Sequence, residues 1–347
     1  MNVSNIQLDC ENAVFINRLE SLENLKNSSL IVTGGTGFLG SWISEVIIYL
    51  NEAQGFNIKL YLLSRNPDKI ASHISGKKFV NIIEKDVRDI FELPNDINYV
   101  IHAAGEPDNR CHLNDPLIVI DSIVRGTDNV ISAAMRLNGL RRISHISSGL
   151  VSGVTDINQK EISENQMHGF DCNSPSNAYA EAKRCSESIV ASYRSLYKLP
   201  LVIARPFTFV GPYQKLDKPW VINHFMRDAF NGGPVRILGN ENTKRSYMYG
   251  ADAAVWMLHI LLRGKTGSAY NVGGDIGFTL KEIAKKVVSG FPNPIKIQTE
   301  LAQENSPPPN SFVPDVSSAK NNLGLKFSVS LDSAIQKTVN WYCRTNE

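Results

Sequence analysis

The segment Leu30–Gly40 constrains the fold more than any other part of the chain. An apolar run is broken by three regularly spaced glycines and leads into the helix-like stretch Ser41–Leu50. A strand, a tight turn and a helix N-terminus can hold a dinucleotide pyrophosphate against free backbone N–H groups. Gly34 would permit the turn, Gly37 the approach of the pyrophosphate, and Gly40 the close packing of helix on strand. The spacing is Gly-x-x-Gly-x-x-Gly, and glycine-rich turns also serve as plain loops, so the segment alone leaves both interpretations open.

Strand-like and helix-like segments alternate through the first two thirds of the chain, which indicates a parallel sheet with helices on both faces. The predicted strands are Leu30–Thr33, Lys59–Leu63, Asn81–Ile83, Tyr99–His102, Arg142–Ser147 and Leu201–Ala204. The predicted helices are Ser41–Glu52, Pro116–Arg136, Ala178–Tyr197, Thr279–Ser289, where Thr279 and Glu282 would form a capping box, and Ser328–Asn340. We therefore predict an α/β fold, a Rossmann-type doubly wound parallel sheet with a smaller C-terminal substrate-binding lobe.

After Pro212 the alternation of strand-like and helix-like segments gives way to a mixed pattern. We expect a dinucleotide-binding domain over residues 29–212 and 240–275, and a substrate-binding lobe over residues 213–239 and 276–347. Residues 1–28 form an N-terminal arm with an apolar stripe at Phe15, Ile16, Leu19, Leu22 and Leu25. Such a stripe predicts packing, either on the domain or on a partner subunit.

Composition excludes several classes of protein. The 347 residues are 42% hydrophobic and 20% charged with a formal net charge of +2, which is typical of a soluble enzyme. Without a long basic run or a long apolar span, we expect neither nucleic-acid binding nor membrane association. The first residues lack the apolar core of a secretory signal, and the five cysteines show no Cys-x-x-Cys spacing. A reducing cytoplasmic location and no metal site follow as expectations.

Tyr179 and Lys183 are the strongest candidates for chemistry. They are four residues apart, so on a helix their side chains share one face. A neighbouring ammonium, helped by an oxidised nicotinamide, would favour the phenolate and lower a pKa that is ordinarily near 10. Tyr179 could then act as general acid or base in hydroxyl–carbonyl interconversion. Ser147 and Ser148 follow a predicted strand at its carboxyl end, and a hydroxyl there could hold the same substrate oxygen.

Several further segments are informative because of their order and spacing along the chain. They are 33–40 (Thr-Gly-Gly-Thr-Gly-Phe-Leu-Gly), Asp86-Val87, 101–105 (Ile-His-Ala-Ala-Gly), 146–148 (Ile-Ser-Ser), 179–183 (Tyr-Ala-Glu-Ala-Lys), 204–207 (Ala-Arg-Pro-Phe), Gly211-Pro212, and 245–247 (Arg-Ser-Tyr) with Asp252. Over residues 29 to 275 this set resembles the extended short-chain dehydrogenase/reductase family, in its NAD(P)-dependent nucleotide-sugar epimerase/dehydratase/reductase branch.

The resemblance implies roles for individual residues. Ser148, Tyr179 and Lys183 would be the catalytic set, and His102 a structural residue beside the cofactor. The resemblance and the glycine motif together predict that the cofactor contacts a larger set of residues. These are Gly34, Thr36, Gly37, Phe38, Leu39, Gly40, Ser64, Arg65, Asp86, Val87, Ala103, Ala104, Gly105, Tyr179, Lys183 and Pro206. A nucleotide-sugar substrate would contact Glu106, Arg110, Ser148, Thr208 and Arg245, with Arg245 similar to the arginine that holds the diphosphate.

Departures from the family pattern separate the possible reactions. Gly149 and Leu150 stand where sugar-nucleotide 4,6-dehydratases carry an Asp-Glu pair that removes water. GDP-fucose-synthase-like enzymes use a cysteine after the serine and a histidine after Gly-Pro, where this chain has Gly149 and Tyr213. Ile123 and Thr208 replace two asparagines that are usual in the family. What remains is 4-keto reduction or 4-epimerisation, which need only a hydride and the Ser-Tyr-Lys set.

The end of the second predicted strand bears on the cofactor. An NAD-specific fold places a carboxylate there, against the ribose 2′-hydroxyl. Ser64 cannot repel a 2′-phosphate, and Arg65 can pair with one, unless it is only a solvated surface residue. We therefore predict NADP(H), with NAD(H) as the alternative. A dissociable NADPH suits a reductase, whereas epimerases and dehydratases keep NAD bound.

The leading hypothesis is NADPH-dependent reduction of a nucleotide-linked 4-keto (6-deoxy)hexose, in nucleotide-sugar biosynthesis for surface polysaccharide. The alternative is an NAD-dependent nucleotide-sugar 4-epimerase or 4,6-dehydratase, and a third is a non-catalytic cofactor-sensing protein. By family resemblance, the helices Pro116–Arg136 and Ala178–Tyr197 pair across a two-fold axis, so we expect a homodimer.

Overall fold

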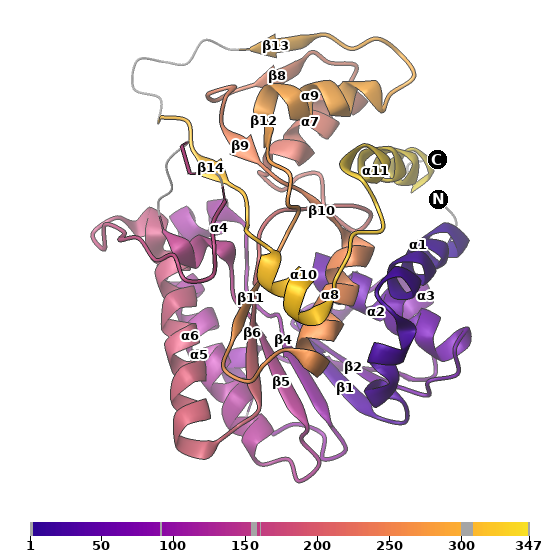
Figure 1. Ribbon diagram of the computed structural model, residues 1–347, viewed down its shortest axis with the longest axis vertical. Helices are drawn as coiled ribbons and strands as arrows, with labels where there is room; N and C mark the ends of the chain where they lie inside the picture. The colour runs from indigo at the N-terminus through magenta and orange to yellow at the C-terminus, as the bar shows by residue number, and fades with distance from the viewer. Residues whose placement is uncertain (1–2, 91, 154–157, 160, 300–307, 346–347) are drawn as a thin grey trace.

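A seven-stranded parallel sheet forms the centre of the computed structural model, which describes residues 3–90, 92–153, 158–159, 161–299 and 308–345 (Figure 1). The strand order is β11-β6-β5-β4-β1-β2-β3, the doubly wound order with the first strand inside. The strands are β1 (Ser29–Thr33), β2 (Lys59–Ser64), β3 (Val80–Glu84), β4 (Tyr99–His102), β5 (Arg142–Ile146), β6 (Leu201–Pro206) and β11 (Ala269–Val272). The predicted α/β fold class is confirmed. The edge strand β11 is an addition that the sequence analysis missed.

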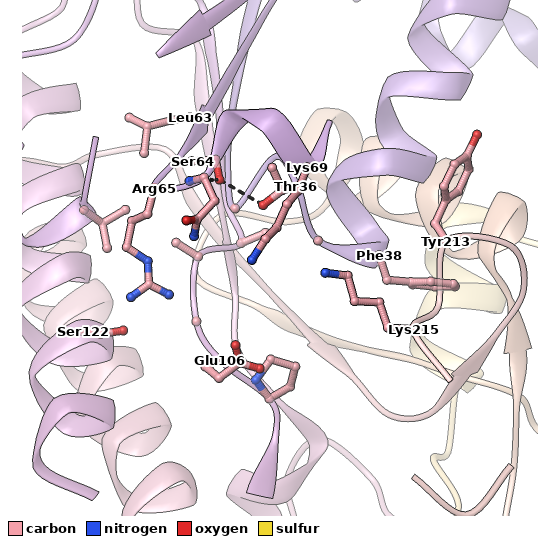
Figure 2. Close-up of a pocket in the computed structure, with 18 of the residues that line it drawn as sticks. Thr36, Phe38, Leu63, Ser64, Arg65, Lys69, Glu106, Ser122, Tyr213 and Lys215 are labelled. Carbon is pink, nitrogen blue, oxygen red and sulfur yellow. Dashed lines mark hydrogen bonds between the residues drawn. The ribbon is translucent and has the colours of Figure 1, made fainter. Parts of the chain in front are cut away.

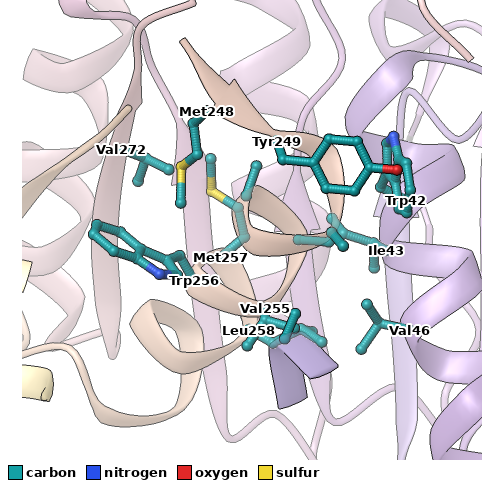
Figure 3. Close-up of a cluster of buried hydrophobic side chains, with 14 of the residues drawn as sticks. Trp42, Ile43, Val46, Met248, Tyr249, Val255, Trp256, Met257, Leu258 and Val272 are labelled. Atoms are coloured by element: carbon teal, nitrogen blue, oxygen red, sulfur yellow. The ribbon is translucent and has the colours of Figure 1, made fainter. Parts of the chain in front are cut away.

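Each inner strand is buried on both faces, because helices cover both sides of the sheet. Leu30 and Val32 of β1 belong to one buried cluster and Ile31 to the other, as the alternation of side chains in a strand requires. On the first side lie α2 (Phe38–Glu52) and α8 (Gly250–Arg263), and on the second lie α5 (Pro116–Met135) and α6 (Ala178–Tyr197). Figure 3 shows the first cluster, in which α8 side chains lie between Trp42 of α2 and Val272 of β11.

The N-terminal arm packs on its own chain. Its helix α1 (Val3–Ile16) contacts α2 and α8, and the short helix η1 (Leu19–Leu25) also contacts α8. Asp9 is buried, and its carboxylate accepts hydrogen bonds from the Tyr249 hydroxyl at 2.7 Å and from the Lys337 ammonium at 2.6 Å. The arm therefore ties the start of α8 to the C-terminal helix α11 (Leu331–Thr345).

Smaller elements gather beyond the carboxyl ends of the central strands (Figure 1). The strands there are β7 (Phe209–Val210), β8 (Val235–Ile237), β9 (Lys244–Arg245), β10 (Met248–Tyr249), β12 (Phe278–Thr279), β13 (Ile297–Thr299) and β14 (Ser311–Phe312). The remaining helices are α3 (Ser72–Ser75), α4 (Asn109–Asn114), α7 (Val221–Phe230), α9 (Leu280–Ser289) and α10 (Ser317–Leu323). The predicted domain boundaries stay a prediction.

Two helix predictions in this part can be compared with the structure. The capping box is present, since the Thr279 side chain and the Glu282 backbone and carboxylate bond reciprocally at the start of α9. The last helix begins at Leu331 rather than at Ser328, because Ser328 and Val329 donate backbone N–H groups to the Asp252 carboxylate. Among the described helices, none is both long and apolar enough to cross a membrane.

Candidate active site

The glycine turn between β1 and α2 leaves no room for side chains. Gly34 has φ +77°, and a Cβ atom there would lie 2.9 Å from the Ala103 carbonyl oxygen. A Cβ on Gly40 would lie 2.6 Å from the Gly34 carbonyl oxygen, so helix and turn are in direct contact. Gly37 caps α2, whose first N–H groups face the turn. This cradle, which Cβ atoms would fill, fits the pyrophosphate of a dinucleotide.

A pocket opens directly in front of the turn (Figure 2). It is lined by twelve of the predicted site residues, from the end of β2, the start of α2 and the loops that follow β1, β2, β3 and β4: Gly34, Thr36, Gly37, Phe38, Ser64, Arg65, Asp86, Val87, Ala103, Ala104, Gly105 and Glu106. The sequence analysis missed several other lining residues: Leu63, Asn66, Lys69, Lys85, Pro107, Ser122, Tyr213, Gln214, Lys215, Lys218 and Trp220. Of these, the residues from 213 to 220 come from the segment after Gly211-Pro212, which no spacing rule places beside β1.

Polar and basic groups surround the end of β2. The Ser64 and Thr36 hydroxyls are 2.9 Å apart (Figure 2). The Arg65 side chain is 53% exposed, and its guanidinium lies 4.0 Å from the Asp86 carboxylate. That carboxylate is held mainly by Arg88 at 2.8 Å, and this hydrogen bond lowers the pKa of Asp86. Among the described residues, no carboxylate occupies the β2 end itself.

Ser148, Tyr179 and Lys183 lie together at the carboxyl end of β5. Tyr179 and Lys183 share one face of α6, and the Lys183 Nζ is 5.9 Å from the Tyr179 ring centroid. Lys183 donates to the carbonyl oxygen of Ile146, the last residue of β5, at 2.8 Å. A Cβ on Gly105 would lie 3.4 Å from the same Nζ, so the lysine borders the cofactor pocket. The Ser148 side chain lies near enough to the Tyr179 phenol to lower its pKa, and its hydroxyl accepts from the Leu150 N–H at 3.1 Å.

Burial dominates the electrostatics of this set. Burial raises the pKa of the Tyr179 phenol to about 12, and the nearby Ser148 side chain opposes this only in part. The lowered pKa of Tyr179 that the sequence analysis expects depends on Lys183 together with an oxidised nicotinamide, and it stays a prediction. The Lys183 ammonium donates to the Ile146 carbonyl oxygen. Burial also lowers the pKa of Lys183 to about 8. Desolvation is therefore the largest influence on the pKa of both side chains.

Gly149 and Phe207 define the space next to Ser148. A Cβ on Gly149 would lie 2.5 Å from the Cε2 atom of Phe207, whose ring stacks on Phe312 at 4.5 Å between centroids. Any side chain at position 149 would have to displace this aromatic pair. His102 is buried and bonds to Thr33 at 2.8 Å and to Thr127 at 3.2 Å, which suits the structural role implied for it.

The predicted substrate residues other than Ser148 each have a bonding partner within the chain. Glu106 accepts from Lys218 at 3.0 Å, and Arg110 pairs with Asp108 at 2.7 Å. The Thr208 hydroxyl donates to the Ser246 carbonyl oxygen, and the Arg245 guanidinium donates to the Asn310 side chain at 2.7 Å. Pro206 ends β6, and Leu39 lies in the first turn of α2. Of these residues only Glu106 lines the pocket itself.

Comparison with known proteins identifies the relatives of this architecture. The family model described as "NAD dependent epimerase/dehydratase family" matches residues 30–273. The dTDP-glucose 4,6-dehydratase of Salmonella typhimurium is 25% identical over 340 residues, which cover 90% of this chain and 92% of the relative.

Two solved structures have the same fold. DesIV, a dTDP-glucose 4,6-dehydratase from Streptomyces venezuelae with NAD bound, superposes with a TM-score of 0.79 and 21% identity, covering 92% of this chain and 98% of DesIV. UDP-glucuronic acid 4-epimerase from Bacillus cereus, in complex with UDP-glucuronic acid and NAD, gives a TM-score of 0.78 and 21% identity, covering 91% of this chain and 99% of the epimerase.

Proposed function

Because the chain belongs to the NAD dependent epimerase/dehydratase family, we propose that it is a nucleotide-sugar 4-epimerase that uses a bound nicotinamide dinucleotide. The relatives are named as dehydratases and 4-epimerases, which favours the alternative of the sequence analysis over its leading 4-ketoreductase hypothesis.

Gly149 favours 4-epimerisation over 4,6-dehydration, the two reactions that this alternative contains. A 4,6-dehydratase needs proton carriers beside the catalytic hydroxyl to remove water across C5 and C6. Gly149 has no side chain, and Phe207 lies 2.5 Å from where its Cβ would be. Leu150 cannot carry a proton. Oxidation and reduction at C4 require neither group.

The chain's own residues supply the proton transfer. Bound NAD(P) would accept a hydride from C4, return it, and place a positive charge beside the Tyr179 phenol. Tyr179 takes the proton of the C4 hydroxyl during oxidation and returns it during reduction. Ser148 orients the same oxygen, and the Lys183 ammonium favours the phenolate. Gly34, Gly37 and Gly40 hold the pyrophosphate, and Arg245 pairs with the substrate diphosphate.

The surroundings of Arg65 favour NADP(H) as cofactor. Arg65, Lys69 and Lys85 all line the pocket, and the β2 end carries Ser64 in place of a carboxylate. The same observation keeps the 4-ketoreductase as a second candidate, because a dissociable reductant suits net reduction.

One experiment distinguishes the three reactions. Purified protein is incubated in D₂O with UDP-glucuronic acid, UDP-N-acetylglucosamine and dTDP-glucose in turn, and the products are examined by NMR. An epimerase yields the C4 epimer of one sugar without deuterium on its carbons and without net cofactor consumption. Deuterium at C5 with loss of the C6 hydroxyl would identify a dehydratase. Stoichiometric oxidation of NADPH with a 4-keto sugar would identify the reductase.

A further inference from the structure

His112 lies against the tyrosine of the catalytic set, at a position that no motif of the chain explains. It belongs to the short helix α4, which begins after the loop that follows β4. Its imidazole stacks on the Tyr179 phenol, with 4.4 Å between ring centroids and 11° between ring planes. His112 is 5% exposed and Tyr179 8% exposed, so the two rings largely exclude water from their contact.

The backbone of the pocket loop fixes the orientation of the imidazole. The Nε2 atom lies 2.7 Å from the carbonyl oxygen of Glu106. A carbonyl oxygen can only accept, so Nε2 carries the hydrogen and donates. Glu106 and its neighbour Gly105 line the cofactor pocket. The imidazole therefore connects the pocket wall directly to the phenol.

Apolar side chains also pack around Tyr179. Its ring belongs to a buried cluster with Val119 and Ile123 of α5 and Ala182 of α6. α6 fixes the Tyr179 backbone, and a flat neighbour restricts the rotation of the ring about its last torsion. That rotation leaves the hydroxyl oxygen in place, because the oxygen lies on the rotation axis. It sets the plane in which the O–H bond lies, and so the direction in which the proton can be passed, and proton transfer depends on this alignment.

We propose that His112 is a positioning residue for Tyr179, which holds the phenol plane so that the O–H bond is directed at Ser148 and the C4 oxygen of the substrate. The proposal rests on the acid–base role assigned to Tyr179 in the proposed function. It adds a residue outside the Ser-Tyr-Lys set, and it assigns a role to the α4 helix.

Three substitutions test the stack. His112→Ala removes the ring, His112→Leu fills its space without a plane, and His112→Phe restores a flat ring without the Nε2–H donor. We expect the Ala and Leu variants to lose ~10- to 100-fold in kcat, while KM for the nucleotide sugar stays within about twofold. The Phe variant should recover to within about threefold of wild-type kcat, because stacking is retained. His168→Ala, at an exposed histidine, should behave as wild type.

The outcomes separate this inference from the proposed function. Wild-type kcat in the Ala or Leu variant would overturn the positioning role, and so would a Phe variant as slow as the Leu variant. Tyr179→Phe is measured in the same assay. If it is inactive while the His112 variants turn over normally, only the inference fails. If Tyr179→Phe keeps wild-type turnover, the assignment of Tyr179 itself fails. If the His112→Ala variant does not fold, the kcat values of the His112→Leu and His112→Phe variants still test the positioning role.

Discussion

At the scale of single residues, the proposed chemistry depends on the Tyr179 hydroxyl. Because the phenol is assigned to proton transfer alone, Tyr179→Phe should lower kcat by ~10²- to 10⁴-fold and leave cofactor affinity nearly unchanged. The product assay gives kcat, and titration of NAD(P)H fluorescence gives the dissociation constant. Cofactor binding lost together with turnover would contradict the assignment, since it would place the hydroxyl in the binding site rather than at the reacting atom.

A second residue-scale prediction concerns the cofactor. If Arg65 pairs with a 2′-phosphate, the contact contributes about 1.5–3 kcal/mol, which is roughly a ten- to hundredfold preference for NADP(H). Ser64→Asp combined with Arg65→Ala should reverse the preference, because a carboxylate accepts from a ribose diol and repels a phosphate. The Kd of each cofactor, in wild type and variant, is the measurement, with the exposed Lys78→Ala as control. Equal affinity of the wild type for both cofactors would exclude this role.

Single residues also show which parts of the candidate site could be predicted from the sequence and which could not. The glycines at 34, 37 and 40 and the residues Tyr179 and Lys183 could be found because their spacing is itself the chemical signal. His112 could not, because it meets Tyr179 across 67 positions of chain through the placement of α4. The effect of burial on the pKa of Tyr179 could not be predicted either, since burial is a property of the fold and not of a helical repeat.

At the scale of elements, a buried carboxyl group in the α8 helix should lower the stability of the folded protein at neutral pH. Asp252 lies in its first turn and is buried, which raises the pKa of its carboxyl from 3.8 to about 6. A raised folded-state pKa means that this group favours folding most below pH ~4, and that the contribution is lost as pH rises through about 6. Above pH ~7 the loss amounts to about 3 kcal/mol. The hydrogen bonds from Ser328 reduce this cost without cancelling it.

Asp252→Asn removes the ionisation and keeps an accepting oxygen for Ser328. Urea unfolding at pH 4.5 and 7.5 should show the variant gaining about 2 kcal/mol relative to wild type between these two pH values, because about 1 kcal/mol of the loss is already present at pH 4.5. Asp68→Asn, at an exposed aspartate, should follow the wild type at both. Parallel pH dependence of wild type and Asp252→Asn would show that the buried carboxyl does not titrate in this range.

Helices and strands could be predicted from the sequence wherever a local pattern of residues determines them. The strand before the glycine turn, the capping box at Thr279 and the long helices α5 and α6 depend on local spacing, and all are present. The strand β11 was missed because its four residues have no pattern of their own and are paired only through β6. The start of α11 was misplaced because the Asp252 carboxylate binds the backbone of residues 328 and 329.

At the scale of the whole molecule, buried polar contacts connect the pocket in front of the glycine turn with α2, α3 and the N-terminal arm. Glu45 of α2 is fully buried and accepts from the Tyr213 hydroxyl, from His73 at 2.6 Å and from Gln7 at 2.5 Å. These partners come from the pocket segment, α3 and α1. No sequence pattern foretells such a junction, because its members are brought together only when the sheet and its flanking helices are assembled.

The same scale carries the prediction of a homodimer. α5 and α6 pack against each other along one side of the sheet (Figure 1), and apolar side chains remain on them, with Leu117 76% and Leu196 71% exposed. A closed two-fold dimer is the commonest way to cover such a face. Light scattering at micromolar concentration should give twice the chain mass for the wild type and the monomer mass for Leu117→Glu with Leu196→Glu. Leu238→Glu, equally apolar and 57% exposed but outside these helices, should stay dimeric. A monomeric wild type would contradict the prediction, and a Leu238→Glu variant that dissociates would place the interface elsewhere on the molecule.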